Sequence, residues 1–134
     1  MALFEVKDYD RKIYEEELRD FLPERILDVH THVWLDELCD PVDPEIAART
    51  VNRPEMVAKD NSIEDLQETF RLLFPGKEVT ALMFSGDDAS VANNAYVAES
   101  ARKTGWPALY YSRPHQTADE LEEIIRKNGF LGIN

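Results

Sequence analysis

The stretch ILDVHTHV, residues 26–33, is a run of mostly apolar and β-branched residues that holds two of the three histidines of the chain. Such a short run is typical of a strand that is buried on both faces of a parallel sheet. Because side chains alternate along a strand, Asp28, His30 and His32 are expected on one face and the residues between them on the other. We therefore predict a strand over 26–33 with two imidazoles on the same face.

Segments with strand and helix patterns alternate along the rest of the chain. Ser62 and Thr117 stand where the N-caps of two helices belong. The stretch 34–61 holds three prolines and no sustained period, which predicts an irregular insertion. Further strands are predicted at 79–84, 108–112 and 130–133, and helices at 10–22, 62–73, 91–103 and 117–128. This alternation predicts an α/β fold with about four parallel strands in right-handed βαβ units.

The composition excludes several classes of protein. With 134 residues, 43% of them hydrophobic and 31% charged, the chain has the make-up of one globular domain. The net charge of −12 opposes binding to nucleic acid, and no apolar run approaches the roughly 20 residues needed to cross a membrane. Glu5 and Asp8 argue against a signal peptide, and the single Cys39 excludes an internal disulfide. We therefore expect a cytoplasmic protein.

The two histidines of the strand are candidate metal ligands. Imidazole is the commonest protein ligand for zinc, and the His-x-His spacing lets two rings approach one ion from the same strand. Asp28 would lie one step deeper on that face, where a carboxylate can orient a ligand. The alternative is that His30 and His32 are ordinary polar residues at a strand end, satisfied by neighbours or by water.

This region also resembles a known family. The predicted helix 10–22 followed by FLPERILDVHTHVW (21–34), and above all Asp28, His30 and His32 as Asp-x-His-x-His, resembles the start of the metal-dependent amidohydrolases. More narrowly it is similar to the amidohydrolase-2 branch, which includes the aminocarboxymuconate-semialdehyde decarboxylase relatives and has a comparable insertion after strand 1. The resemblance implies a distorted TIM-type (β/α)8 barrel with the metal at the C-terminal ends of the strands. Residues 1–134 would form its N-terminal half as a single partial domain, since a full barrel needs about 250 residues.

The resemblance further implies a metal-dependent hydrolase that acts on a small-molecule substrate. A metal-activated water would attack a C–N or C–O bond, or the reaction would be a non-oxidative decarboxylation. In the family the other ligands lie on later strands, which this chain does not reach, and Asn134 stands near the place of a lysine that bridges two metals in some branches. We expect a single divalent ion, with zinc favoured over iron, nickel or copper. This chain alone is expected to be inactive.

Residues after the other strands are weaker candidates. Arg113 could hold a substrate carboxylate with help from His115, although an ordinary loop is the favoured account of both. Trp34 could form a wall of the substrate pocket or simply pack against the insertion. Ser85 and Cys39 have no partner in the sequence that would make either a nucleophile, so no catalytic residue is assigned.

Two classes of function remain open. One is the metal-dependent hydrolase, and the other is a half-barrel without a full catalytic set that acts as a structural or assembly module. A homo-oligomer would connect them, because an open parallel sheet leaves a strand edge and apolar faces uncovered.

Overall fold

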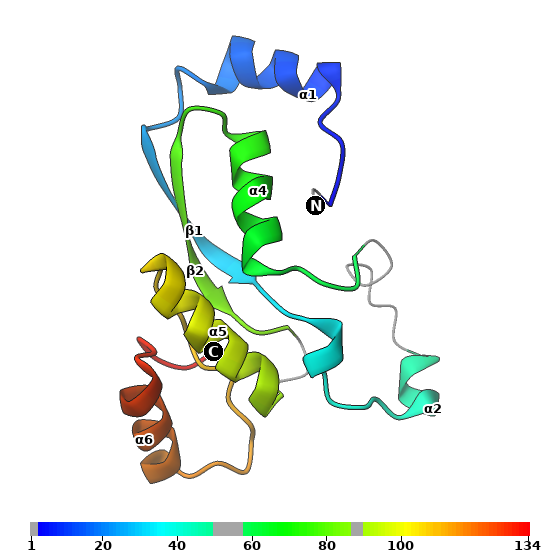
Figure 1. Cartoon of the computed structure of the whole chain (residues 1–134), viewed down its shortest axis with the longest axis vertical. Helices are drawn as coiled ribbons and strands as arrows, with labels where there is room; N and C mark the ends of the chain where they lie inside the picture. The colour runs from blue at the N-terminus through cyan, green and yellow to red at the C-terminus, as the bar shows by residue number, and fades with distance from the viewer. Residues whose placement is uncertain (1–2, 50–57, 87–89) are drawn as a thin grey trace.

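The computed structural model describes residues 3–49, 58–86 and 90–134, and its elements follow the order shown in Figure 1. The strands are β1 (Arg25–His32) and β2 (Glu78–Phe84), and they pair in parallel. The α-helices are α1 (Asp8–Ile13), α2 (Pro44–Ala47), α4 (Ile63–Leu73), α5 (Val91–Thr104) and α6 (Ala118–Asn128). A π-helical turn, η1 (Tyr14–Leu18), continues α1, and a 3-10 turn, η2 (Asp36–Leu38), follows β1.

The α/β class is confirmed, but the prediction of about four parallel strands forming the N-terminal half of a (β/α)8 barrel is wrong. The sheet of the described residues has two strands, β1 and β2. The segment 108–112, predicted as the third strand, forms two isolated parallel bridges: Ala108 with Met83 of β2, and Tyr110 with Ile133 of the predicted fourth strand. Main-chain bonds, such as those from Leu109 N–H to Met83 and from Tyr110 N–H to Gly132, hold these segments beside β2, but neither forms a strand of the sheet.

Side-chain hydrogen bonds explain why the 108–112 segment does not continue as a strand. Asn94 of α5 accepts from the main-chain N–H of Tyr111 at 2.9 Å and donates to its carbonyl at 3.1 Å. Both backbone groups of Tyr111 are thus taken by a helix side chain. Pro107, at the start of the segment, has no N–H to donate to a neighbour. Pairing with β2 therefore stops after the bond from the Leu109 N–H to the Met83 carbonyl, while Tyr110 still pairs with the 130–134 segment.

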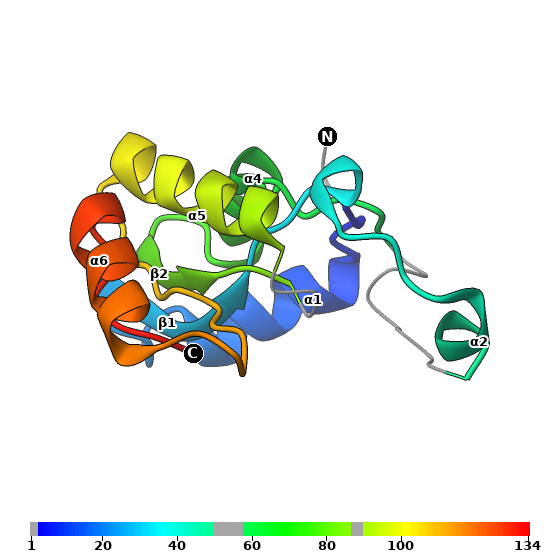
Figure 2. The same ribbon diagram turned by 90° about the horizontal axis from the view of Figure 1, so that it is seen from below.

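The hydrophobic core lies between the sheet and the helices above it. Figure 2 shows α4 and α5 on one side of the two strands. The core cluster joins residues of β2, α4 and α5 with others from the segments after β1, α5 and α6: Val33, Ile63, Leu66, Phe70, Ala81, Met83, Val97, Ala98, Ala108, Tyr110 and Phe130. Its members from β2, Ala81 and Met83, are two residues apart and share a face, so the helices cover that face of the sheet.

The helices after the insertion confirm their predicted caps. Ser62 accepts from the N–H of Asp65 at the start of α4, and Thr117 forms a capping box with Glu120 at the start of α6. Gly105 and Gly129 end α5 and α6 with φ values of +72° and +76°, which an L side chain rarely adopts. These boundaries are set by residues close in sequence.

The α-helix predicted over 10–22 begins earlier, at Asp8, and after Ile13 it widens into the π-helical turn η1, where the N–H of Arg19 donates to the carbonyl of Tyr14. Tyr14 is buried, and its hydroxyl donates to the carbonyl of Pro75 after α4 at 2.7 Å. This bond fastens the N-terminal helix to the end of α4.

The predicted insertion 34–61 holds only η2 and α2 among its described residues.

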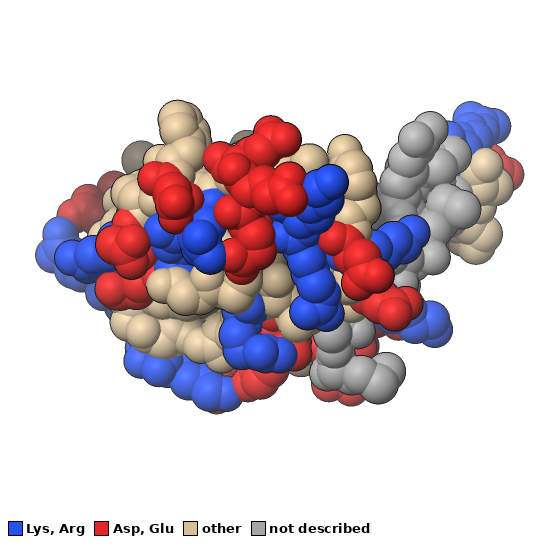
Figure 3. All heavy atoms as spheres, turned by 90° about the horizontal axis from the view of Figure 1, so that it is seen from above, with Lys and Arg blue, Asp and Glu red and all other residues tan. Residues whose placement is uncertain are grey.

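Acidic and basic side chains are interspersed on the surface shown in Figure 3. The exposed Glu15 pairs with Arg19, and the exposed Glu16 pairs with Lys12. None of the helices in the described ranges is both long and apolar enough to span a bilayer.

Candidate functional site

His30 and His32 lie together at the end of β1, on the face of the sheet opposite α4 and α5, because His32 pairs with Phe84 and not with the core residue Met83. Their ring centroids are 5.2 Å apart. Both rings meet the ring of Phe84 edge-on, with centroid distances of 4.9 Å from His30 and 4.4 Å from His32. Phe84 is itself 1% exposed, so the two imidazoles rest on a buried aromatic platform. The predicted sharing of one face by the two histidines is confirmed.

The orientation of His32 is set by a main-chain carbonyl. Its Nδ1 lies 2.7 Å from the carbonyl oxygen of Ser85, the residue that follows β2. A carbonyl oxygen only accepts, so this hydrogen bond requires the proton to sit on Nδ1. In the neutral ring, the lone pair is then on Nε2. Metal-binding histidines commonly hold their second nitrogen in this way, through an N–H to a carbonyl or carboxylate.

Asp28 does not share the face of the histidines, contrary to the expectation from alternation. It pairs with Ala81, whereas His32 pairs with Phe84, and these partners are three residues apart on β2, so they point to opposite faces. The register shifts between Asp28 and Thr31, where β1 carries one residue more than β2. Such a bulge reverses the alternation along one strand.

The carboxylate of Asp28 accepts a hydrogen bond from the backbone of the bulge. Its Oδ1 accepts the main-chain N–H of His30 at 3.0 Å, a group that the shifted register leaves without a place in the ladder. Asp28 therefore does not orient a histidine ring as predicted, but holds the backbone that carries His30.

Trp34 packs against the insertion. Its indole N–H donates to the carbonyl of Lys59 at 2.7 Å, and its main chain forms an antiparallel bridge with Asn61. The other side of the side chain faces Gly86, where an added Cβ would lie 3.6 Å from Trp34 atoms. Of the two readings of this residue, the contacts favour packing over a pocket wall.

Arg113 and His115 lie in the turn before α6. The guanidinium of Arg113 donates to the carboxylate of Asp40 at 2.6 Å, so its charge is balanced within the chain. His115 is exposed in the same turn. Among the residues that the structure describes, no group of three His, Cys, Asp or Glu side chains is placed to hold a metal ion. The structure thus brings together two predicted ligands, without a third.

Two residues around the histidines were not singled out from the sequence. Asn61 donates from its side-chain amide to the carbonyl of His32 at 2.7 Å, and Ser85 provides the carbonyl for the His32 ring. The adjacent Asn93 and Asn94 of α5 are also buried and bond to main-chain groups. Asparagine is a poor helix former, so two in succession inside a helix are a signal that their side chains hold something else.

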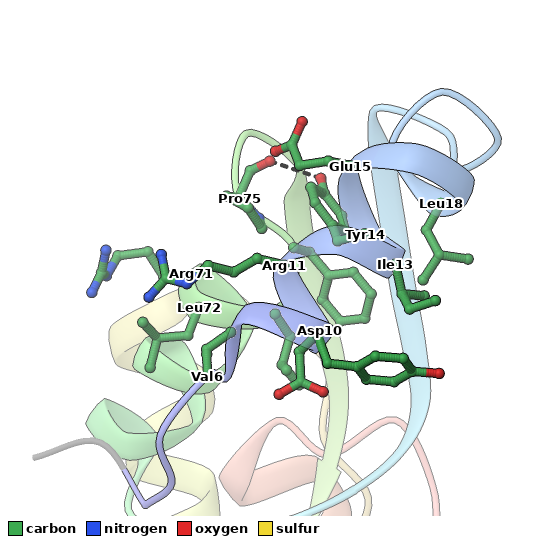
Figure 4. A pocket seen from close by; sticks show the side chains of 13 residues that line it. Val6, Asp10, Arg11, Ile13, Tyr14, Glu15, Leu18, Arg71, Leu72 and Pro75 are labelled. Atoms are coloured by element: carbon green, nitrogen blue, oxygen red, sulfur yellow. Dashed lines mark hydrogen bonds between the residues drawn. The ribbon is translucent and has the colours of Figure 1, made fainter.

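A groove of about 670 Å³ lies elsewhere, between the N-terminal helix and the end of α4. Figure 4 shows its lining, in which Ile13, Leu18 and Leu72 are apolar and Arg11 and Arg71 are basic. The groove is lined by none of the residues predicted for the site. The histidine pair therefore lies on the open sheet face and not in this groove.

The comparisons with known proteins leave the family open. No protein-family model, no curated protein and no solved structure matches this chain. The similarity to the amidohydrolases accordingly rests on the motif at residues 28–32 and remains a prediction.

Proposed function

We propose that His30 and His32 bind a divalent metal ion, zinc before other ions, and that they supply ligands to a metal-dependent hydrolase of the amidohydrolase type. The observation that carries this proposal is the 2.7 Å contact between His32 Nδ1 and the carbonyl of Ser85. It leaves Nε2 as the free acceptor on the ring. A histidine that served only as a polar strand end would have no need of a fixed tautomer.

The donor set suits the proposed ion. Imidazole nitrogens are favoured by zinc and by related transition metals, and catalytic zinc sites keep a position open for water or substrate. When bound, the ion would lower the pKa of its water and polarise a substrate carbonyl. The ring of Phe84 contacts both imidazoles edge-on, and the carbonyl of Ser85 keeps the proton of His32 on Nδ1. The further ligands would be water, substrate or groups other than those the structure describes.

The substrate class follows from the predicted chemistry. A small molecule with a hydrolysable C–N or C–O bond, or with a carboxylate that leaves as carbon dioxide, is the class that this motif favours. Leu27 and Val29 are both exposed on β1, the strand that carries the histidines, and give it an apolar surface.

Metal analysis tests the ligand assignment. The chain is stripped with a chelator, reloaded with zinc, dialysed and analysed by inductively coupled plasma mass spectrometry. We expect bound zinc in the wild-type chain and its loss in His30→Ala and in His32→Ala. His115→Ala is the matched control, because it removes the remaining histidine from an exposed turn. Zinc content that survives both strand substitutions would refute the assignment.

A metal-binding module without turnover is the second candidate. It is favoured by the lack of a third His, Cys, Asp or Glu ligand within the described ranges 3–49, 58–86 and 90–134. Activated esters and amides such as p-nitrophenyl acetate, offered to the zinc-loaded chain, separate the two functions. Turnover that disappears with His32→Ala supports the hydrolase, and zinc binding with no turnover supports the module.

A further inference from the structure

Asn61 holds the end of the strand that carries the histidines. Its main chain exchanges two hydrogen bonds with Trp34, at 3.0 and 3.1 Å. Its side-chain amide donates to the carbonyl of His32 at 2.7 Å. Three bonds from one residue therefore fix the backbone from His32 to Trp34.

These bonds lie on the edge of β1 away from β2. Successive residues of a strand direct their backbone groups to opposite edges. The N–H of Val33 donates to Phe84 of β2, so the backbone groups of His32 and Trp34 point to the other edge. Asn61 thus takes the place of a neighbouring strand at the point where β1 would otherwise end without support.

His32 is consequently held from two directions. Asn61 fixes its main chain at the carbonyl, and Ser85 fixes its ring at Nδ1. A ring can meet the Ser85 carbonyl only while the backbone stays in register, because the imidazole is attached to that backbone through two rotatable bonds.

We infer that Asn61 is a positioning residue for the histidine pair: its side-chain amide keeps the imidazole of His32 in the Nδ1–H tautomer with Nε2 directed outward for a ligand. The inference rests on the proposed metal site for its purpose, but the tautomer itself is a property of the metal-free chain. Groups that orient metal-binding histidines typically change metal affinity about 10- to 100-fold when they are removed.

The first measurement is nitrogen-15 NMR of the imidazoles in the metal-free full chain, with His32→Ala used to assign the His32 signals. We expect the Nδ1–H tautomer in the wild type and a mixture of tautomers in Asn61→Ala. The second variant, Asn61→Asp, has nearly the same shape but cannot donate to the carbonyl when it is ionised. It should also lose the single tautomer.

The second measurement is the zinc dissociation constant of the same variants. We expect it to rise at least about tenfold in Asn61→Ala and also in Asn61→Asp. Weaker zinc binding by Asn61→Asp would point to the lost hydrogen bond, because a carboxylate added near a cation would otherwise attract the cation and tighten binding. Asn128→Ala is the matched control: it removes the same kind of bond, from Asn128 Nδ2 to the carbonyl of Ile124 at 2.9 Å, on α6.

The outcomes separate the inference from the proposed function. A changed tautomer in both Asn61 variants, with Asn128→Ala like the wild type, supports the inference even if the wild type fails to bind zinc, in which case the metal site alone is refuted. An unchanged His32 tautomer in both Asn61 variants overturns the inference, whatever happens to zinc. So does a dissociation constant that changes equally in Asn61→Ala and Asn128→Ala, because this would be a general effect on stability.

Discussion

Replacement of Asn93 by alanine should destabilise the chain well beyond an ordinary helix substitution. Asn93 lies in the first turn of α5 and is fully buried. Its Oδ1 accepts from the N–H of Leu35 at 3.0 Å, and its Nδ2 donates to the carbonyl of Leu35 at 3.3 Å and to Cys39 Sγ at 3.4 Å. The side chain therefore ties α5 to the loop that follows the histidine strand.

The magnitude can be worked from these contacts. The two bonds to the Leu35 main chain contribute about 1 kcal/mol each. The Leu35 N–H that loses its acceptor adds about 1 kcal/mol, at the lower end for a group that is only partly buried. Alanine is the better helix former and returns about 0.6 kcal/mol. We expect Asn93→Ala to lower the free energy of unfolding by about 2.4 kcal/mol.

Urea denaturation followed by circular dichroism measures this difference, provided that the slope of the transition stays constant. Asn128→Ala is the comparison, because its single bond on α6 is partly exposed and its loss is offset by helix propensity. A change below about 0.5 kcal/mol for Asn93→Ala, or one equal to that of Asn128→Ala, would show that the loop is not held by this side chain.

Three further results are expected. Tyr14→Phe should cost about 1 kcal/mol in urea denaturation, since it removes only the hydroxyl bond to Pro75, and an unchanged midpoint would mean that the N-terminal helix is not anchored there. Hydrogen bonds from the main chain and hydroxyl of Thr117 lower the pKa of Glu120. The ionised carboxylate therefore stabilises the fold above its ordinary pKa, and this stability is lost as the pH falls through the lowered pKa. Glu120→Gln should flatten the acid side of the curve of unfolding free energy against pH, and a curve identical to that of the wild type would refute this. Zinc at a hundredfold excess over its dissociation constant should raise the Tm by roughly 10 °C in the wild type and not in His30→Ala, as measured by calorimetry.

The helices after the insertion could be predicted because their signals are local. Ser62 and Thr117 cap helices whose first turns begin at the next residue, and Gly105 and Gly129 end helices at positive φ. Each signal depends on residues within one turn. The N-terminal helix was less well placed, since the π-helical turn at 14–18 has no comparable marker in the sequence.

The strands were harder because pairing depends on distant residues. The run 108–112 has strand composition, yet Asn94 takes both backbone groups of Tyr111. Apolar composition predicts that a segment is buried and extended, but not which groups receive its hydrogen bonds. The same run is buried beside β2 through one bridge to Met83.

In the candidate site, too, features set by neighbouring residues were predicted and features set by distant residues were not. The His-x-His spacing was sufficient to predict that His30 and His32 share a face, because His30 is the last residue of the bulge and His32 lies beyond it. Asp28 precedes the bulge, so the prediction from strict alternation that it shares the face of the histidines was wrong. Asn61 lies at the end of the proline-rich insertion, 29 residues from His32, where no periodicity links it to the strand.

The extra residue in β1 also bears on how this strand tolerates change in length. A chain with one residue fewer between Asp28 and Thr31 would pair regularly with β2 and would still direct Ile26 and Thr31 toward the helices and His32 toward Phe84. Removing a residue on either side of that short interval would instead exchange the two faces of half the strand. Deletion of Val29 would therefore keep both the strand pairing and the proposed ligand His30, whereas a deletion elsewhere in β1 would disrupt the pairing.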